Sequence, residues 1–438
     1  MRARYILLQV LGLASFCFSC SPSPAAAAED ETTQAESPVS LINTSHLDHL
    51  FTTLKVKDQE VGGIWIYSEA PDYRLVTDED EGFTCVDDVA RSLVFYCRYY
   101  EQEPSAKILE RIESLAEFIL QMQAENGYFN NFVFPDGTVN TTHQNSVATP
   151  NSWSWRAFWA LTELRVVNAK ELKEVQSRSL TVIDVMIPLI SQLCPEPEDT
   201  YEVAGLSLPR CLSEMGTDQI AVILQGLNNH YRQSPSEELR ALIRKMGDLM
   251  LSAQAGSEEQ APYGAFLSWQ NLWHAWGNTQ AYALLSAGEL IEEASFVAAG
   301  LREVRGFQSY FLAQDGLHAF EIEQKDKKLV LVNVRQFPQI AYNIRPMVYA
   351  ALKAYELTGE EAYALQAAEL TAWFLGDNPA EKVIYDATSG RTFDGINSAD
   401  QVNQNSGAES TIEALLTLLA VEQVPVAQAA LLAVVKPE

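Results

Sequence analysis

The feature that most constrains the fold is a series of amphipathic segments joined by connections of alternating length. Apolar residues recur at helical spacing in twelve segments, and capping or turn residues bound each of them. Connections into the odd-numbered segments are short, such as residues 168–169 and 358–359, whereas those into the even-numbered segments are long. Because a short connection joins antiparallel neighbours, the sequence predicts six helical hairpins.

These hairpins predict an all-α fold, an (α/α)6 toroid in which six inner helices are surrounded by six outer ones, with small β-hairpin insertions. The predicted helices span residues 41–54, 86–100, 105–123, 154–167, 170–193, 217–232, 236–254, 279–293, 296–312, 339–357, 360–374 and 408–421. A small hairpin is expected at 127–137, and a strand pair at 317–323 and 329–334. The competing α-solenoid would show one fixed period, which the varied loops here do not.

The N-terminus has the pattern of an export signal. Arg2 and Arg4 precede an apolar run at 5–18, which is too short to span a bilayer as a mature helix. We expect a lipoprotein junction with lipid attached to Cys20, because the Ser-, Pro- and Glu-containing stretch after it is typical of a flexible tether. Cleavage within 25–28 is the alternative. The predicted organisation is a signal peptide (1–20), a disordered tether (21–40), the toroid (41–425) and a C-terminal tail (426–438).

This organisation predicts an exported protein, either a lipoprotein of the cell envelope (periplasm or outer membrane) or a secreted protein. A formal net charge of −28 excludes a general nucleic-acid binder and disfavours a strongly anionic polymer as substrate. The lipid on Cys20 is therefore the one membrane contact that we expect. Cys194 and Cys211 flank a Pro-containing loop and are candidates for a disulfide, which the sequence leaves open. Cys85 and Cys97 stand at opposite ends of a predicted helix and cannot pair.

The starts of the even-numbered helices carry aromatic, amide and guanidinium side chains. If these helices form the inner ring, their N-termini and the long loops gather at one mouth. Aromatic faces stack on sugar rings, and amides and guanidinium groups hydrogen-bond hydroxyls. The predicted sugar-binding residues are Trp153, Trp155, Arg156, Trp273, His274, Trp276, Asn278, Tyr342, Asn343, Arg345 and Asn405.

Four carboxyl groups at the same mouth are candidates for catalysis. Glycoside hydrolysis needs one protonated and one ionised carboxyl group across the scissile bond. Asp87 and Asp88 begin the first inner helix and Glu409 begins the last, so ring closure makes them neighbours; Asp218 is the fourth candidate. We expect Glu409 to donate the proton and Asp87 or Asp88 to activate water. The alternative is that these residues only cap or complement helix N-termini.

Three motifs resemble a six-hairpin glycosidase-like group, some of whose members are fused to bacterial glycosyltransferases. Residues 82–91, G-F-T-C-V-D-D-V-A-R, resemble its G-Y-C-T-D-D-N-A-R-A run. Residues 156–161, R-A-F-W-A-L, and 403–411, N-Q-N-S-G-A-E-S-T, resemble two further signatures. The resemblance implies the toroid and carbohydrate processing. At 151–155 this chain has N-S-W-S-W where the group often has acidic residues, so it lacks a carboxylate pair there.

These observations favour a glycoside hydrolase that acts on an uncharged or weakly charged poly- or oligosaccharide. One alternative is a lyase or epimerase of uronic-acid glycans, which His274, Tyr342 and Arg345 would serve. Another is a non-catalytic glycan-binding lipoprotein. No cofactor is expected and no zinc pattern is present; a calcium ion in the 377–394 loop is the alternative, since oxygen ligands are dense there.

Overall fold

The computed structural model describes residues 40–196 and 198–434. The predicted signal peptide, the cysteine expected to carry lipid (Cys20), the predicted tether up to residue 39 and residues 435–438 of the predicted tail lie outside this range. The chain divides at Ser40 into two units, and the unit that begins at Leu41 holds the helices and strands given below.

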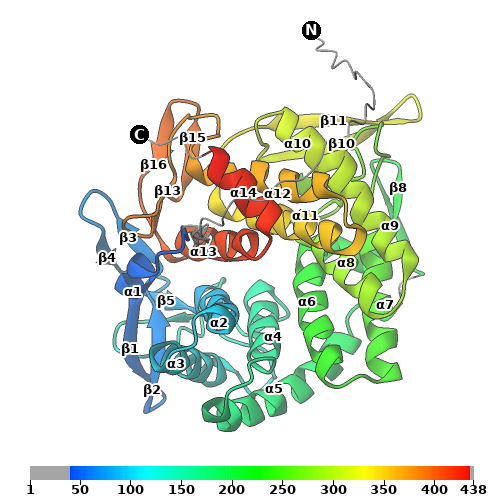
Figure 1. Ribbon diagram of the computed structural model, residues 1–438. Coiled ribbons are helices and arrows are strands. Elements are labelled where there is room, and N and C mark those ends of the chain that lie inside the picture. Colours follow the sequence, from blue (N-terminus) through cyan, green and yellow to red (C-terminus); the bar gives the residue numbers. More distant parts are fainter. Residues whose placement is uncertain (1–39, 197, 435–438) are drawn as a thin grey trace, which may run out of the picture. The chain divides into compact units, whose positions relative to one another are not determined.

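Six helices pack side by side into a closed inner ring (Figure 1). They are α2 (Val86–Gln102), α4 (Ser152–Leu164), α6 (Thr217–Gln233), α8 (Gln280–Leu290), α11 (Arg345–Thr358) and α13 (Ala408–Glu422). Each contacts the next in this order, and α13 contacts α2, so the ring closes between the first and last members. Their apolar residues are buried nearly all round, as expected for helices with neighbours on every side.

An outer layer of helices covers this ring, one helix after each inner member. It consists of α3 (Ala106–Met122), α5 (Lys173–Ser191), α7 (Glu237–Ser252), α9 (Ala294–Arg302) continuing into α10 (Ser309–Ala313), α12 (Glu361–Ala372) and α14 (Pro425–Val434). A π-helical segment, Glu303–Gln308, joins α9 to α10. There the carbonyl of Tyr263 lies so close to Gly306 that an added Cβ would stand 2.3 Å from its oxygen.

The expected first helix, 41–54, is wrong in its second half. The helix α1 covers only Ser45–Leu50, and an antiparallel hairpin follows, β1 (Phe51–Val56) and β2 (Gln59–Ile64). Its two-residue turn places Lys57 and Asp58 at φ 49° and 67°, the left-handed geometry that matches strand twist. This hairpin packs on α3, and the sixth outer helix is instead α14, within the segment that we expected to be a tail.

Short β-sheets form within the connections between the helices. Two-stranded pairs are β3 (Tyr67–Glu69) with β4 (Arg74–Val76), β5 (Thr84–Cys85) with β6 (Phe132–Val133), β7 (Thr200–Val203) with β8 (Leu206–Pro209), and β13 (Tyr385–Asp386) with β14 (Arg391–Thr392). Three-stranded sheets are β11 (Lys328–Arg335), β10 (Ala319–Lys325) and β9 (Leu272–His274), and β12 (Gln339–Ile340), β15 (Gly395–Ser398) and β16 (Gln401–Asn403). The strand β6, which lies within the hairpin expected at 127–137, therefore pairs with β5 from an earlier part of the chain.

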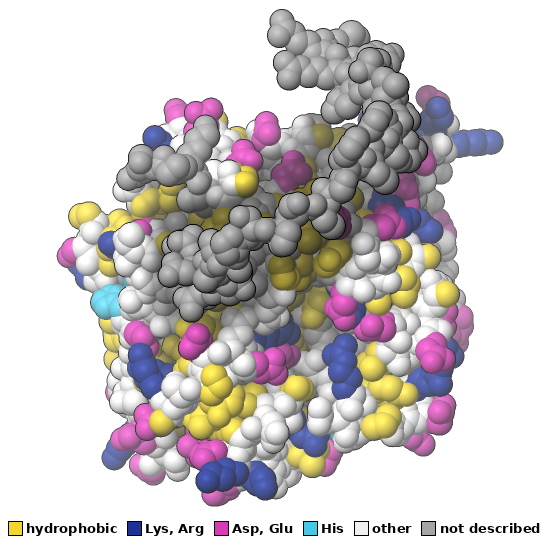
Figure 2. All heavy atoms as spheres, viewed as in Figure 1, with side chains coloured by type: hydrophobic (Ala, Val, Ile, Leu, Met, Phe, Trp, Pro, Cys, Tyr) yellow, Lys and Arg dark blue, Asp and Glu magenta, His cyan; other side chains and the backbone are white. Residues whose placement is uncertain are grey.

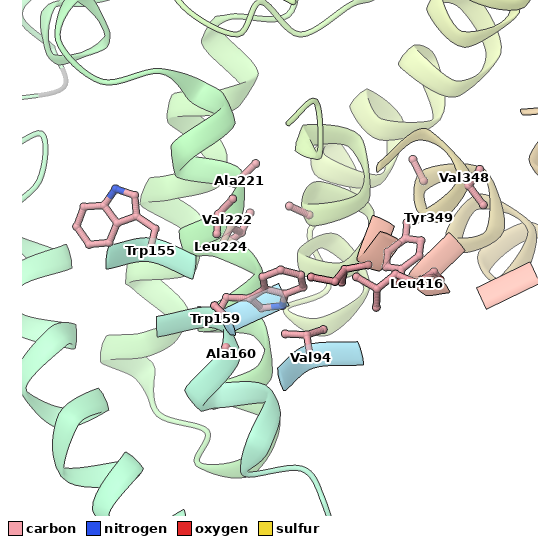
Figure 3. Close-up of a cluster of buried hydrophobic side chains, with 14 of the residues drawn as sticks. Val94, Trp155, Trp159, Ala160, Ala221, Val222, Leu224, Val348, Tyr349 and Leu416 are labelled. Carbon is pink, nitrogen blue, oxygen red and sulfur yellow. Dashed lines mark hydrogen bonds between the residues drawn. The ribbon is translucent and has the colours of Figure 1, made fainter. Parts of the chain in front are cut away.

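The centre of the ring is filled with apolar side chains. Figure 3 shows Val94, Trp159, Tyr349 and Leu416, which come from α2, α4, α11 and α13, converging there. Because these side chains fill the centre of the ring, the surface at the N-terminal ends of the inner helices is separate from the surface at their C-terminal ends.

The structure answers the question that the sequence left open about Cys194 and Cys211, and it confirms that Cys85 and Cys97 do not pair. Cys194 and Cys211 form a disulfide with Cα atoms 5.3 Å apart, which closes the loop containing β7 and β8. Cys85 and Cys97 are free and buried.

On the face shown in Figure 2, Lys and Arg side chains are scattered among Asp and Glu, which is not the clustered basic surface that phosphate binding requires. Within the described range no single helix is long and apolar enough to cross a bilayer; α13 and α14 meet that test only together, bent by 119°.

Candidate active site

A cavity of about 500 Å³ lies where the inner helices begin. Its polar lining includes Asp87, Asp88, Arg91, Arg156, Tyr342, Asp394 and Glu409, and its apolar lining includes Phe132, Trp276 and Ile340. These residues come from the starts of α2, α4 and α13, from the segments before α8 and α11, from β6 and from the connection between β14 and β15. The cavity thus unites residues that are more than 300 positions apart in the sequence.

The first turn of α2 is held in place from outside the helix. Asn131 accepts a hydrogen bond from the backbone N–H of Val86 through its carbonyl (2.9 Å) and one from that of Asp87 through Oδ1 (3.2 Å). These bonds satisfy two of the free amides that a helix start leaves. The side chains of Asp87 and Asp88 are therefore not needed as caps.

The Arg91 guanidinium connects the first and last helices of the inner ring, α2 and α13. Its Nη1 donates to Asp88 Oδ1 and its Nη2 to Glu409 Oε2, each at 2.8 Å, while Nε lies 3.4 Å from Glu413 Oε1. Asp88 and Glu409 differ in access, since their side chains are 5% and 40% exposed. One buried cation therefore holds a buried and an open carboxyl group at the same cavity.

A second cation orders the opposite wall. Arg156 Nη1 donates to Asp87 Oδ1 at 2.5 Å, and its Nη2 donates to the Tyr342 hydroxyl at 3.3 Å. The guanidinium carbon atoms of Arg91 and Arg156 lie 4.8 and 5.6 Å from the centre of the Tyr342 ring. The ring is thus fixed by cation–π contacts as well as by its hydroxyl.

Arg345 supports the site from behind. It forms an ion pair with Glu413, and both side chains are buried. Burial raises the pKa of Glu413, and the charges of Arg345 and Arg91 oppose that shift. Arg345 therefore holds the network beneath the cavity, which corrects the expectation that it binds sugar directly.

Two of the predicted carboxyl groups have a raised pKa. Burial raises the pKa of Asp88 to about 6, against the opposing charge of Arg91. Burial likewise raises the pKa of Asp218 to about 6, opposed by a backbone hydrogen bond and by the charge of Arg156. Carboxyl groups in this range can hold a proton near neutral pH, which is the requirement for a general acid.

Asp218 lies beside an aromatic stack at the edge of the cavity. His274 Nε2 is 3.7 Å from Asp218 Oδ2, and the His274 ring stacks on Trp276 with centroids 4.0 Å apart. The ring of His318 lies 4.8 Å from that of Trp276. Burial lowers the pKa of His274 to about 4 and lowers that of His318, so both imidazoles are neutral at pH 7.

No family model matches the sequence, and no curated protein matches it significantly. Solved structures match it over most of its length. A sugar epimerase from a ruminal bacterium aligns at 12% identity and a TM-score of 0.61, over 86% of this chain and 95% of the epimerase. A cellobiose 2-epimerase from Bacillus thermoamylovorans aligns at 13% identity and a TM-score of 0.59, over 84% of this chain and 94% of the epimerase. A family 76 glycoside hydrolase from Bacteroides thetaiotaomicron aligns at 11% identity and a TM-score of 0.52, over 81% of this chain and 74% of the hydrolase.

The chain is an (α/α)6 toroid. The resemblance to the six-hairpin glycosidase-like group is thereby confirmed at the level of the fold, which is what alignments at this identity show. Of the predicted site residues, the toroid brings Asp87, Asp88, Arg156, Trp276, Tyr342 and Glu409 together around one cavity. Asp218 and His274 lie next to it through Trp276.

Three predicted tryptophans belong to the core of the toroid. Trp153 donates to the Phe129 carbonyl, and Trp155 is fully buried and donates to Gln219. Trp273 is also fully buried, with its ring stacked on Phe320 at 5.2 Å. The expectation that these three indoles stack on sugars is corrected, because the rotation of each helix or strand turns them away from the cavity.

Three predicted amides also do not line the cavity of the toroid. Asn405 uses Oδ1 to accept the backbone N–H of Ala70 at 3.1 Å, so it secures a loop. Asn278 and Asn343 are buried. Asn278 Oδ1 and both polar atoms of the Asn343 side chain have no protein partner within the described residues.

Sequence reasoning missed several residues that border the cavity. Arg91 was not among the predicted site residues, although its position three residues after Asp88, on the same helix face, was a signal. Tyr67 and Glu81 come from loops before α2, where the Tyr67 hydroxyl donates to Glu81 Oε2 at 2.8 Å. No periodicity marks such loop residues.

Asp394, also missed, positions the start of α13. Its Oδ1 accepts bonds from the Gly407 amide (2.9 Å) and the Ser410 hydroxyl (2.7 Å). Gly407 is required there, since an added Cβ would lie 2.7 Å from the Ile66 carbonyl oxygen. Across residues 40–196 and 198–434, no group of three His, Cys, Asp or Glu side chains is arranged to hold a metal ion.

Proposed function

We propose that this toroid is a carbohydrate-processing enzyme, a glycoside hydrolase that acts on an uncharged or weakly charged oligo- or polysaccharide. The observation that carries the proposal is that one cavity is bordered by Asp88, with a pKa raised to about 6, and by the exposed carboxylate of Glu409. A protonatable carboxyl group and an accessible carboxylate are the pair that glycosidic cleavage uses.

The environments favour a reversal of the roles that the sequence suggested. Asp88 is the candidate general acid, because burial favours its protonated form. Glu409 is the candidate base or nucleophile, because it is open to the cavity and oriented by Arg91. Asp87 and Arg156 form a pair that can bind sugar hydroxyls, and Trp276 offers an aromatic face.

The charges around the cavity support a substrate with little charge. Arg91 and Arg156 each have carboxylate partners, so neither guanidinium carries an uncompensated charge toward the cavity. Family 76 glycoside hydrolases are among the structures with this fold, which is consistent with the proposal.

A specific observation favours a second candidate, an epimerase or isomerase. His274 and His318 flank Trp276, and burial keeps both imidazoles neutral and able to accept a proton. Such a base can remove a proton next to a sugar carbonyl group. Cellobiose 2-epimerase and D-mannose isomerase structures share the fold.

Product analysis separates the candidates. The full-length protein, its Asp88→Asn and Glu409→Gln variants, and a Glu361→Gln control on an exposed outer helix are incubated with plant and microbial glycans and with reducing disaccharides. A hydrolase releases new reducing ends, which Asp88→Asn and Glu409→Gln abolish and Glu361→Gln retains. Conversion of one reducing sugar into another without new ends identifies the epimerase. Binding without turnover identifies the non-catalytic glycan-binding protein.

A further inference from the structure

A second cavity, of about 490 Å³, opens at the opposite end of the ring. Its lining includes Arg98 of α2, Arg232 of α6 and Lys353 of α11, which lie in the C-terminal halves of their helices. Tyr282, near the start of α8, and Tyr349, in the first half of α11, complete the wall. The candidate active site lies at the N-terminal ends of the same helices. Between the two ends stands Trp159, over whose ring the Arg345 guanidinium lies at 5.7 Å.

The floor of this second cavity is polar and narrow. An extension of about 10 Å³ shares Arg98, Arg232 and Tyr282 with the cavity and is bordered by Trp159, Gln225 and Asn228. That volume admits one water-sized group. Trp159 Nε1, Gln225 Oε1 and Asn228 Oδ1 are buried there without a protein partner among the described residues. One unpaired donor and two unpaired acceptors therefore border a space for one small polar group, beside Arg98 and Arg232.

The charges of the walls are largely balanced. Arg98 binds Glu163 through Nε (2.6 Å) and Nη2 (3.2 Å). Lys353 Nζ lies 2.7 Å from Glu289 and 2.9 Å from Glu356. The remaining cation, Arg232, is exposed and donates to Asn229 Oδ1 at 3.3 Å. A strongly charged ligand would find no matching excess of charge in this cavity.

The floor atoms select the kind of group that can enter. A hydroxyl group donates one hydrogen bond and accepts others, so it can satisfy both Trp159 Nε1 and an amide oxygen. A carboxylate could not donate to the oxygens of Gln225 and Asn228, and an ammonium group could not accept from Trp159. The rings of Tyr282 and Tyr349, 5.3 Å apart, add aromatic surface to the wall.

We propose that this cavity is a second saccharide-binding site, which takes a mono- or disaccharide with one hydroxyl group in the floor. Its volume is within the range of small-molecule sites. The sugar hydroxyl supplies the partner that these floor atoms lack among the described residues. The proposal rests on residues separate from the candidate active site and stands whether or not that site hydrolyses glycans.

The test uses indole N–H resonances of the protein labelled with 15N-tryptophan. Trp159 reports on the second cavity and Trp276 on the candidate active site, and the two signals are assigned through Trp159→Phe and Trp276→Phe. Glucose, mannose, xylose, cellobiose and maltose are each titrated to 100 mM. We expect at least one of them to move the Trp159 signal in a saturable manner.

The variants are Gln225→Met, which removes a floor acceptor, and Arg232→Gln, which removes a donor at the exposed rim. Each is expected to weaken the Trp159 response about tenfold and to leave the Trp276 response as in the parent. Arg178→Gln, at an exposed arginine of the outer helix α5, is the matched control and changes neither signal. The proposal is overturned if none of the five sugars moves the Trp159 signal, or if its response survives unchanged in both variants. Arg232 is on the surface, so this variant remains informative should Gln225→Met fail to fold.

Discussion

Arg91 donates hydrogen bonds of 2.8 Å to both Asp88 and Glu409, from the two terminal nitrogens of one guanidinium group. Asp88 belongs to the first inner helix and Glu409 to the last, so this side chain bridges the seam at which the ring closes. The same contact orients the two carboxyl groups that we propose for catalysis. Stability and chemistry are therefore linked at Arg91.

The first prediction concerns Arg91→Met. The change leaves Asp88 and Glu413 buried without their shared cation, and loss of one partner in a buried ion pair costs about 3–5 kcal/mol. Urea unfolding of the variant measures that loss. Arg74→Met is the control, because the Arg74–Glu69 pair is 68% and 40% exposed and should contribute little to stability. Equal losses in the two variants would contradict the account.

The second prediction concerns pH and Glu303 in the π-helical segment. Burial raises the pKa of Glu303 to about 8 from the ordinary value of 4.5, and its Oε1 accepts the Phe266 amide at 2.8 Å. Folding thus favours the protonated form, and this contribution to stability is complete below pH 4.5 and is lost as pH rises through 8. The urea midpoint of the parent should therefore be lower at pH 9 than at pH 5.

Glu303→Gln keeps an acceptor oxygen and cannot ionise, so its midpoint should fall less over the same interval. The exposed Glu361→Gln variant should follow the parent. A Glu303→Gln midpoint that falls as steeply as that of the parent would show that Glu303 does not titrate in this range.

The third prediction compares two tryptophans three residues apart. Trp276 borders the cavity, so Trp276→Ala should raise KM at least tenfold while the free energy of unfolding changes little. Trp273 is fully buried, so Trp273→Ala should destabilise the fold by about 3–5 kcal/mol. Steady-state kinetics and urea unfolding of both variants make the comparison. A KM that stays constant in Trp276→Ala would remove this residue from the sugar site.

The fourth prediction concerns Cys20, which lies outside the described residues. We propose that the chain is exported and attached to the envelope by lipid on this cysteine. In a bacterial host, Cys20→Ser should move the protein from the membrane fraction to the soluble fraction and end its labelling by fatty acid. Retention of Cys20→Ser in the membrane fraction would contradict the anchor.

The helices of the ring were predictable because each carries apolar residues at helical spacing over three or more turns. Residues 51–64 were not, because their hairpin depends on a left-handed turn at Lys57 and Asp58, two residues with no glycine to mark it. Helix α14 begins at Pro425, directly after α13, and such a short segment is stabilised by packing on α12 and α13.

The candidate site was predictable as a set of helix starts, and Asp87, Asp88 and Glu409 do share a cavity. Which side of a helix start faces that cavity depends on how each helix is rotated in the ring. In the same way, the path of β9 and of the loop after it places Trp276 at the cavity and Trp273 in the core, and no periodicity distinguishes them. The bridging role of Arg91 likewise requires the closed ring, since Glu409 is far away in the sequence.

The central claim is that Asp88 supplies the proton that cleaves a glycosidic bond. Its most direct test is the pH dependence of kcat/KM for reducing-sugar release by the parent, beside the activity of Asp88→Asn at each pH. We predict that kcat/KM falls as pH rises through about 6, where Asp88 loses its proton, and that Asp88→Asn loses at least about a hundredfold in rate. Release by Asp88→Asn at the parental rate would contradict the claim.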